Sequence, residues 1–320
     1  NPVQFTNQSQ GAVNYRWDFD DGQSSTTVSP SRQYNLPGRY EVELVATSNN
    51  NCADSITQAV AIYPKPQAAF SYQDVCDEVA MPFSDQSTIL NGNYQRQWTF
   101  GNQLGSSSAA NPFFTFPSDG SYDVELKLTS NQGCLDSITQ RVQVFALPQT
   151  AFQVADICAD DPARFNNQST GAVSYRWDLG DGRDSRATQP EVAYDVPGTY
   201  SITLQSTSSE GCQTDSTRTL SVRRLPEARF AASPVWAYDS AQFINQSIGA
   251  SSYQWDFGDN QGTSSAVEPR YRYAKPGPYD VQLIAETRFG CRDTARAIQR
   301  IDTVPSAAFA AADVCLGQPV

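Results

Sequence analysis

The amino-acid sequence predicts an all-β fold in which small β-sandwiches follow one another along the chain. Apolar residues alternate with polar ones over short stretches, and turn residues are plentiful, with 19 glycines and 19 prolines. Short strands separated by turn signals at regular spacing are typical of β-sandwiches. A tryptophan-containing hexapeptide also recurs four times, at Trp17, Trp98, Trp177 and Trp255. A fixed period of about 79 residues is the signature of a tandem array.

A second marker sets the repeat boundaries. A proline followed four residues later by a phenylalanine opens the units, at Pro66, Pro148, Pro226 and Pro305. The predicted domains are residues 1–65, 66–147, 148–225 and 226–304, with residues 305–320 as the first strand of a following repeat. Units of this length are near the small end of what folds on its own core.

The two ends of the sequence are in the same phase of the repeat. Residues 1–9 match residues 161–169, so the first repeat begins without its opening strand, and residues 318–320 match residues 1–3. Two interpretations remain open. The favoured one is a window from a longer array, and the alternative is a tail that completes the first repeat of another copy by strand addition.

The composition excludes several classes of function. The net charge is −12 and the isoelectric point is near 4.4, so neither nucleic acid nor an anionic membrane is an expected partner. No run of 18 apolar residues is present, so we expect no membrane span in this window. Because the sequence contains no histidine, the usual general base and a common metal ligand are missing. We therefore expect no enzyme.

Each repeat contains two strong strand patterns. In the first, Tyr15, Trp17 and Phe19 share one face, which is the period-two pattern of a half-buried strand. The second follows a Pro-Gly turn and opens with a tyrosine, as at residues 37–40. A tyrosine that opens the sixth strand of an immunoglobulin-like sandwich forms a tyrosine corner, in which its hydroxyl bonds nearby backbone. This strand reverses at a polar tip into a last strand, such as residues 138–144.

These motifs resemble the polycystic-kidney-disease (PKD) domain over essentially the whole chain. The resemblance lies in the Trp-Asp-Phe-Gly-Asp run at residues 255–259 and the Pro-Gly-x-Tyr run at residues 276–279. With Gly-Cys at the hairpin tips, it is similar to repeats of very long surface proteins of gliding and filament-forming bacteria. The resemblance implies extracellular seven-stranded sandwiches without catalytic residues. The second repeat departs from the motif at Thr99, Asn102 and Gln103.

The acidic residues after the tryptophan strand are candidate ligands for Ca²⁺, which prefers oxygen donors. They are Asp18, Asp20, Asp21, Asp178, Asp181, Asp256 and Asp259. The favoured alternative is that Asp and Gly close a hairpin turn, since both suit turn geometry. The second repeat has lost these acids but keeps its tryptophan, which supports the turn. The tryptophans themselves are predicted to be core rather than a sugar-stacking platform.

The seven cysteines follow the same period and suggest an oxidising, extracellular setting. Four lie at hairpin tips (Cys52, Cys134, Cys212 and Cys291), and three lie after an opening strand (Cys76, Cys158 and Cys315). Trp236 takes the place of a fourth in the second group. Partners within one repeat are too far apart for a disulfide, about 27 Å. Because the bottom of one repeat abuts the top of the next, we expect Cys76 to pair with Cys212, and Cys158 with Cys291. Cys52, Cys134 and Cys315 would find partners outside the window.

Together these features predict an extended, rigid rod that serves as a structural segment of a bacterial surface filament, stalk or adhesin. Its role would be to give length, stiffness and attachment to a target-cell surface, with further repeats of the same chain and a homo-oligomeric filament or bundle as partners. The alternative is an array of carbohydrate- or protein-binding modules in a secreted protein. A shallow aromatic groove, repeated on each unit, would favour that alternative.

Overall fold

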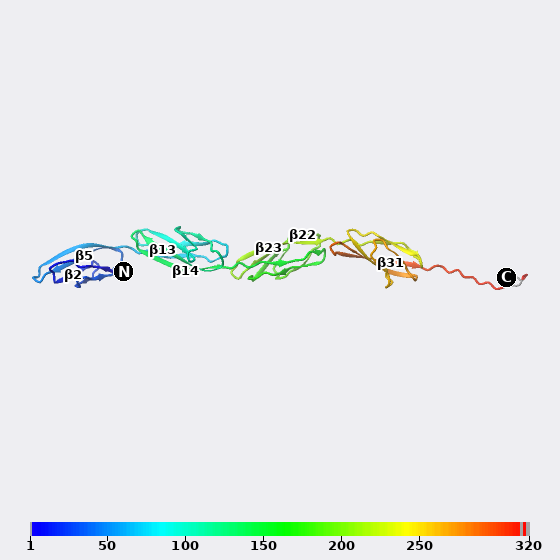
Figure 1. The fold of residues 1–320 in the computed structure, drawn as a ribbon, viewed down its shortest axis with the longest axis horizontal. Helices are drawn as coiled ribbons and strands as arrows, with labels where there is room; N and C mark the ends of the chain where they lie inside the picture. Colours follow the sequence, from blue (N-terminus) through cyan, green and yellow to red (C-terminus); the bar gives the residue numbers. More distant parts are fainter. Residues whose placement is uncertain (1, 314–315, 318–320) are drawn as a thin grey trace. The chain divides into compact units, whose positions relative to one another are not determined.

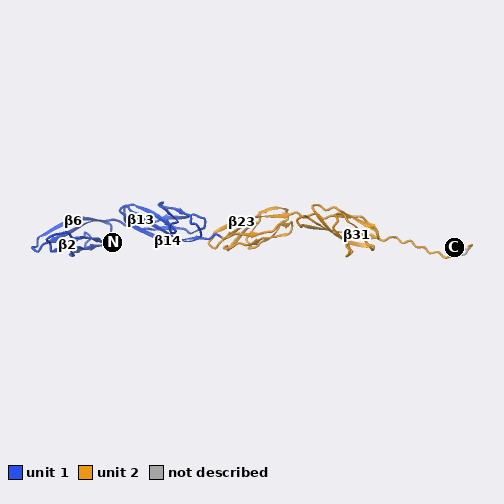
Figure 2. Cartoon of the chain, viewed as in Figure 1, with its two compact units in different colours: residues 1–147 blue, residues 148–320 orange. Residues whose placement is uncertain are grey.

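The computed structural model describes residues 2–313 and 316–317, and all regular secondary structure in this part is β-strand. The all-β prediction is therefore confirmed. None of the described residues forms a helix that could cross a membrane. The chain divides into two compact units, residues 1–147 and 148–320 (Figure 2). Each unit contains two of the predicted repeats, and the division at Leu147 and Pro148 coincides with a predicted repeat boundary.

The second repeat, in the first unit, shows the arrangement of the sandwich. One sheet has the strand order β11-β10-β13-β14-β8, and the other has the order β12-β9-β7. The long β13–β14 hairpin is visible in Figure 1. The bounds are β7 (Phe70–Tyr72), β8 (Val75–Cys76), β9 (Met81–Asp85), β10 (Tyr94–Phe100), β11 (Gly105–Ser107), β12 (Phe113–Phe114), β13 (Gly120–Ser130) and β14 (Leu135–Phe145).

The opening strand is divided between the two sheets. Its first part, β7, pairs antiparallel with β9, and its second part, β8, pairs in parallel with the end of β14. The sequence pattern predicts one strand here. The break at residues 73–74 lets the chain pass from one sheet to the other, so that β7 and β8 each form one edge of a sheet.

The second unit repeats this plan twice, with five-stranded sheets in the order β16-β23-β22-β19-β20 and β25-β31-β30-β27-β28. The third repeat has β15 (Phe152–Gln153), β16 (Ile157–Cys158), β17 (Pro162–Arg164), β18 (Asn166–Asn167), β19 (Ser174–Asp178), β20 (Asp184–Ser185), β21 (Glu191–Ala193), β22 (Gly198–Thr207) and β23 (Gln213–Arg223). The fourth has β24 (Phe230–Ala232), β25 (Val235–Trp236), β26 (Ser240–Asn245), β27 (Ser252–Asp256), β28 (Thr263–Ser264), β29 (Arg270–Arg272), β30 (Gly277–Glu286) and β31 (Arg292–Asp302).

The first repeat has fewer strands than the others. They are β1 (Val3–Gln4), β2 (Asn14–Asp18), β3 (Ser24–Ser25), β4 (Ser31–Arg32), β5 (Gly38–Thr47) and β6 (Ala53–Ile62). The sheet order is β3-β2-β5-β6. Within the described residues, β6 is the last strand of this sheet.

Each repeat encloses its own hydrophobic cluster, and no cluster takes residues from two repeats. Trp98, Trp177 and Trp255 are fully buried, and Trp17 retains 6% of its exposure. The phenylalanine of each opening strand packs on the indole with its edge, at centroid distances of 5.1, 5.0 and 5.1 Å in the second to fourth repeats. The tryptophans are thus core residues and not a surface platform.

The tyrosine that opens each long strand closes a corner, as the sequence predicts. Its hydroxyl donates a hydrogen bond to the carbonyl oxygen four residues earlier. The pairs are Tyr40 to Leu36 at 2.9 Å, Tyr122 to Ser118 at 2.9 Å, Tyr200 to Val196 at 2.6 Å and Tyr279 to Lys275 at 2.8 Å. This bond fixes the turn that leads into the central strand of every repeat.

Candidate functional site

The tryptophan hydrogen-bonds the loop that follows its hairpin. The indole Nε1–H donates to the carbonyl oxygen of Ala109 at 2.9 Å, of Ala187 at 2.9 Å and of Ala266 at 3.0 Å in the second to fourth repeats. A buried indole that satisfies its only donor in this way anchors the loop to the core. In the first repeat the buried Nε1 of Trp17 has no such partner.

The aspartates after the tryptophan strand organise the turn. Asp178 and Asp256 each accept a backbone N–H two residues later, from Gly180 and Gly258, at 2.9 Å. Asp18 accepts in the same way from Asp20 at 3.1 Å. These are the self-closing bonds by which Asp favours turns. Gly180 has φ +72°, and a Cβ there would lie 2.6 Å from the carbonyl oxygen of Ser201, so the close approach requires glycine.

The next aspartate of each motif is held by side chains as well as by backbone. Asp181 accepts from the backbone N–H of Arg183 at 3.0 Å and from its guanidinium Nε at 2.7 Å. Asp21 is bonded similarly by Gln23 N–H at 3.1 Å and Arg32 Nε at 2.6 Å. The remaining candidate of the first repeat, Asp20, accepts the Glu41 N–H at 2.9 Å.

In the fourth repeat a tyrosine replaces the arginine partner. Asp259 accepts the N–H groups of Gln261 and Gly262 and the hydroxyl of Tyr271. Burial alone would raise the pKa of Asp259, but these hydrogen bonds outweigh it and hold the pKa below its usual value. The same contact with Asp259, together with burial, raises the pKa of Tyr271 to about 12.

The carboxylates of these aspartates therefore accept hydrogen bonds from N–H groups of their own turns. Among the described residues, no group of three or more histidine, cysteine or acidic side chains is placed to hold a metal ion. The seven candidates Asp18, Asp20, Asp21, Asp178, Asp181, Asp256 and Asp259 are divided among three separate turns. Their hydrogen bonds fit the hairpin-turn interpretation.

A disulfide joins the third and fourth repeats within the second unit. Cys158 and Cys291 are bonded, with an S–S distance of 2.05 Å and a Cα–Cα distance of 5.6 Å, across 133 residues of sequence. This is one of the two pairs that the cysteine spacing predicts. Cys158 ends β16, beside Arg223 at the end of the last strand, and Cys291 ends the hairpin tip between β30 and β31.

Some of the remaining cysteines are disulfide-bonded and others are free. Cys76 and Cys212 are each disulfide-bonded. Cys52 is free and exposed, and Cys134 is free and partly exposed. Cys315 lies outside the described residues. Trp236, at the position equivalent to Cys158, pairs with Asp302 in the same parallel manner and is 52% exposed.

Non-covalent contacts surround the Cys158–Cys291 bond. The guanidinium of Arg223 lies over the ring of Phe289, 4.2 Å from its centroid, and also bonds Asp156 at 2.8 Å. A hollow of about 440 Å³ is lined by these residues with Cys158, Asp161 and Arg164. Sequence reasoning missed this cation–π contact, because Arg223 and Phe289 belong to different repeats and neither lies in a motif.

The linkers are held by acids at the hairpin tips. In the first unit Asp136 accepts the Ala68 N–H at 2.8 Å and forms an ion pair with Lys65 at 2.7 Å. In the second unit Asp293 accepts the Ala228 N–H at 2.8 Å. These contacts fix the start of each repeat to its own last strand, only a few residues after the preceding repeat ends.

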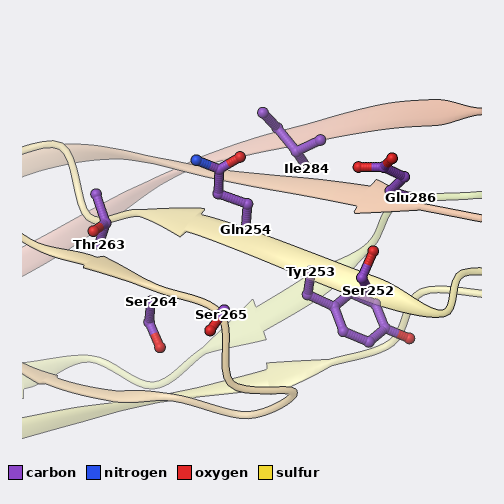
Figure 3. A pocket seen from close by; sticks show the side chains of 8 residues that line it. All are labelled: Ser252, Tyr253, Gln254, Thr263, Ser264, Ser265, Ile284 and Glu286. Carbon is purple, nitrogen blue, oxygen red and sulfur yellow. The ribbon is translucent and has the colours of Figure 1, made fainter. Parts of the chain in front are cut away.

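The outer sheet face has a hollow at equivalent places in the third and fourth repeats. That of the fourth is about 650 Å³ and is formed by β27, β30 and the β28 hairpin. Gln254, Ile284 and Glu286 project to one side of the sheet, whereas the Tyr253 ring projects to the other (Figure 3). The third repeat lines the same place with Arg176, Asp178, Asp184, Thr203, Gln205 and Asp215. Neither hollow presents an aromatic platform.

Comparison with known proteins identifies the repeat. A family model described as the PKD domain matches residues 2–63, 147–223 and 226–302. The matched ranges leave out the second repeat, in which the tryptophan motif departs from the others. The structure nevertheless gives this repeat the same strand order as its neighbours.

Individual relatives match shorter parts of the chain. It is 32% identical over 137 residues to the pre-pro-metalloprotease PrtV of Vibrio cholerae, which covers 41% of this chain and 14% of that protein. It is 31% identical over 81 residues to collagenase ColA of Bacillus cereus, covering 25% of this chain and 8% of that protein. The PKD1 domain of Vibrio anguillarum Epp, a solved structure, is 30% identical over 24% of this chain and 95% of its own, with a TM-score of 0.22. The chain thus spans a small fraction of the two proteases.

Proposed function

Because the chain belongs to the PKD domain family, we propose that it is a structural segment of an extracellular bacterial surface filament, stalk or adhesin. Its role is to give length and stiffness and to carry attachment to a cell surface. The observation that carries this proposal is the Cys158–Cys291 bond, which joins two separately folded repeats. A covalent link between neighbouring cores limits bending at the junction.

Two further features support a mechanical role, and two others bear on the partners. The Arg223–Phe289 stack adds a contact at the same junction that does not depend on redox state. Asp136 and Asp293 tie the linkers to the following repeats. The net charge of −12 disfavours nucleic acid as a partner, and further repeats of the same chain and other copies are the proposed partners. The hollows on the outer faces of the third and fourth repeats are lined mainly by polar residues and give less support to a carbohydrate-binding array.

We also propose that the chain is not an enzyme. The aspartates of its tryptophan motifs accept hydrogen bonds within their own turns, and the sequence has no histidine. The matches to this chain cover only 14% and 8% of the length of the two protease relatives, so their activity is not transferred to it.

Small-angle X-ray scattering of the chain tests the proposed rod. A last strand of 11 residues spans about 36 Å, so four repeats in line give a maximum dimension of roughly 150 Å. In Cys158→Ser we expect a broader distribution of interatomic distances, because the junction of the third and fourth repeats loses its covalent link. Cys52→Ser, which removes a free thiol, is the matched control. A compact particle, or an unchanged distribution in Cys158→Ser, would contradict the proposal.

A further inference from the structure

The smaller sheet of each repeat carries an equivalent pair of residues on its outer face, and the charge of this pair differs among the repeats. The two residues lie opposite each other on neighbouring antiparallel strands. From the first repeat to the fourth, the pairs are Gln4 with Ser31, Pro82 with Phe113, Arg164 with Glu191, and Gln242 with Arg270. The third repeat thus has an ion pair at this place, whereas the fourth has a cation with no opposite charge across the strand.

A second arginine lies two residues further along the same strand of the fourth repeat. Arg272 lies opposite Ser240 and projects to the same side of β29 as Arg270, because alternate residues of a strand share a face. Both arginines are exposed. Two residues of an antiparallel strand span about 6.8 Å. The strand therefore presents two guanidinium groups to solvent at the spacing of neighbouring outward side chains.

Neighbouring acids do not neutralise these two guanidinium groups. Among the described residues, the arginines of the fourth repeat that form ion pairs are Arg229, Arg292 and Arg296. Asp239 and Glu268, the acids that adjoin the two strands, are exposed and pair with neither Arg270 nor Arg272 within this part of the chain. Charges are screened beyond about 8 Å at physiological ionic strength. The two local cations, rather than the net charge of −12, therefore decide what binds to this face.

An exposed tyrosine lies beside the second arginine. Tyr238 is 60% exposed, and the guanidinium of Arg272 lies 6.0 Å from the centroid of its ring. The φ of Tyr238 is +74°, in the left-handed region that bulky residues rarely adopt. The second and third repeats have Glu78 and Asp160 at this position, with φ +67° and +70°. The turn therefore does not require an aromatic residue, and the exposed ring adds little to the core.

This surface does not depend on the absence of a following repeat. In the third repeat, which the fourth follows within the same unit, the residues equivalent to the tyrosine and the two arginines are Asp160, Glu191 and Ala193. All three are exposed. Trp236 is different, because it takes the place of Cys158, which contacts the next repeat through its disulfide. Trp236 is therefore not counted as part of the surface.

We propose that this face of the fourth repeat binds an acidic polysaccharide whose sugar residues carry carboxylates. Each guanidinium is a planar fork of N–H donors that matches a carboxylate with two parallel hydrogen bonds. The ring of Tyr238 provides an apolar surface for a sugar ring. The amide of Gln242 and the hydroxyl of Ser240 can donate to and accept from sugar hydroxyl groups. A polymer that engages one arginine meets the other as an intramolecular contact, which increases its affinity.

The same residues favour a polysaccharide over an acidic segment of a protein. An acidic peptide would use the two cations and leave the tyrosine ring, the amide and the hydroxyl without a function. The inference rests on the proposed attachment to a cell surface, for which it names the bound material, and it assigns binding to one repeat rather than to an array. Scattering measures the shape of the chain and not this face, so absence of binding would leave the test of the rod unaffected.

Isothermal titration calorimetry of the full chain with polygalacturonate, a polymer of uronic acid, tests the proposal. We expect saturable binding that weakens as the salt concentration increases, because the contacts are between exposed charges. Dextran, a neutral polysaccharide, is the matched ligand control, and we expect it not to bind. Absence of saturable binding to polygalacturonate would overturn the inference. Equally strong binding to polyglutamate or to duplex DNA would also overturn it, because the site would then recognise charge alone.

Variants of exposed residues locate the binding site without disturbing the core. We expect Arg270→Gln combined with Arg272→Gln to weaken binding of polygalacturonate at least about tenfold, as loss of charged hydrogen bonds does. The matched control combines Arg186→Gln with Arg218→Gln, which removes two exposed arginines of the third repeat and changes the net charge equally. We expect this control to bind as the parent does. Equal losses in the two double variants would show that net charge, and not this face, controls binding.

A third variant tests the tyrosine. Tyr238→Gly removes the ring and suits the positive φ of this position, so the fold should be kept, and an unchanged Tm verifies this. We expect binding of polygalacturonate to weaken about fivefold, as loss of one stacking contact does. Binding of unchanged strength in Tyr238→Gly would contradict recognition of a sugar ring.

Discussion

The guanidinium of Arg223 lies over the ring of Phe289, 4.2 Å from its centroid, and joins the end of one repeat to the hairpin tip of the next. Asp156 of the same repeat forms an ion pair with this arginine at 2.8 Å. The arginine is therefore positioned by its own repeat before it meets the aromatic ring of the neighbour. Such preorganisation reduces the entropy lost when the contact forms.

A double-mutant cycle measures this contact. In a Cys158→Ser, Cys291→Ser background, Arg223→Ala and Phe289→Ala are combined, and unfolding by denaturant is followed by tryptophan fluorescence. We expect a coupling free energy of about 1 kcal/mol, as for a partly desolvated cation–π pair. The control cycle uses the exposed pair Arg292 and Glu286, for which about 0.3 kcal/mol is expected. Coupling no larger than that of the control would refute the role of the stack.

The indole hydrogen bond predicts unequal effects of one substitution in two repeats. Trp177→Phe removes buried volume and leaves the Ala187 carbonyl without its donor, so we expect a loss of about 2–4 kcal/mol. Trp17→Phe should cost about 1 kcal/mol less, because its Nε1 has no acceptor. Hydrogen exchange followed by mass spectrometry resolves the local opening free energy of each repeat. Equal losses in the two repeats would show that the loop bond is not stabilising.

The Asp259–Tyr271 contact predicts loss of stability at both ends of the pH scale. The pKa of Asp259 is lower in the folded chain than its ordinary value. The carboxylate therefore stabilises the fold above about pH 4, and this contribution is lost as pH falls through the folded pKa. The pKa of Tyr271 is raised to about 12, so its contribution is complete below about pH 10 and is lost as pH rises toward 12.

Single variants separate the contributions of Asp259 and Tyr271 from those of the other titratable side chains. The difference in Tm between the parent chain and Asp259→Asn should shrink below pH 4. The difference between the parent and Tyr271→Phe should shrink above pH 10. A Tm difference that is constant across pH would mean that neither group changes its pKa on folding.

The hydrogen bonds of the turn aspartates predict that calcium does not change the stability of the fold. Because their oxygens already accept backbone and side-chain donors, Tm is expected to be the same in excess EDTA and in millimolar calcium. In Asp181→Asn, too, we expect the Tm to be the same in EDTA and in calcium. An increase of Tm with calcium that is abolished in Asp181→Asn would establish a metal site instead.

The features that sequence predicted are those set by local pattern. Period-two alternation gave the tryptophan strand, and the Pro-Gly-x-Tyr run gave the tyrosine corner, because each depends on residues a few positions apart. The Cys158–Cys291 pair was predicted from the spacing of the repeats, which sets the cysteine after one opening strand against the hairpin-tip cysteine of the next repeat. Other features depend on packing between distant residues. The division of the opening strand at residues 73–74, the alanine acceptor of each indole and the Arg223–Phe289 stack leave no local signal.

The parallel pairing of β16 with β23 has a consequence for a chain under tension. A repeat is pulled through the strand by which the chain enters and the strand by which it leaves. Ile157 lies beside Val222 in these two strands, which run in the same direction. Force along the chain therefore slides one strand past the other, and their hydrogen bonds must break together rather than one after another. The repeat resists stretching most strongly along the direction in which its neighbours would pull.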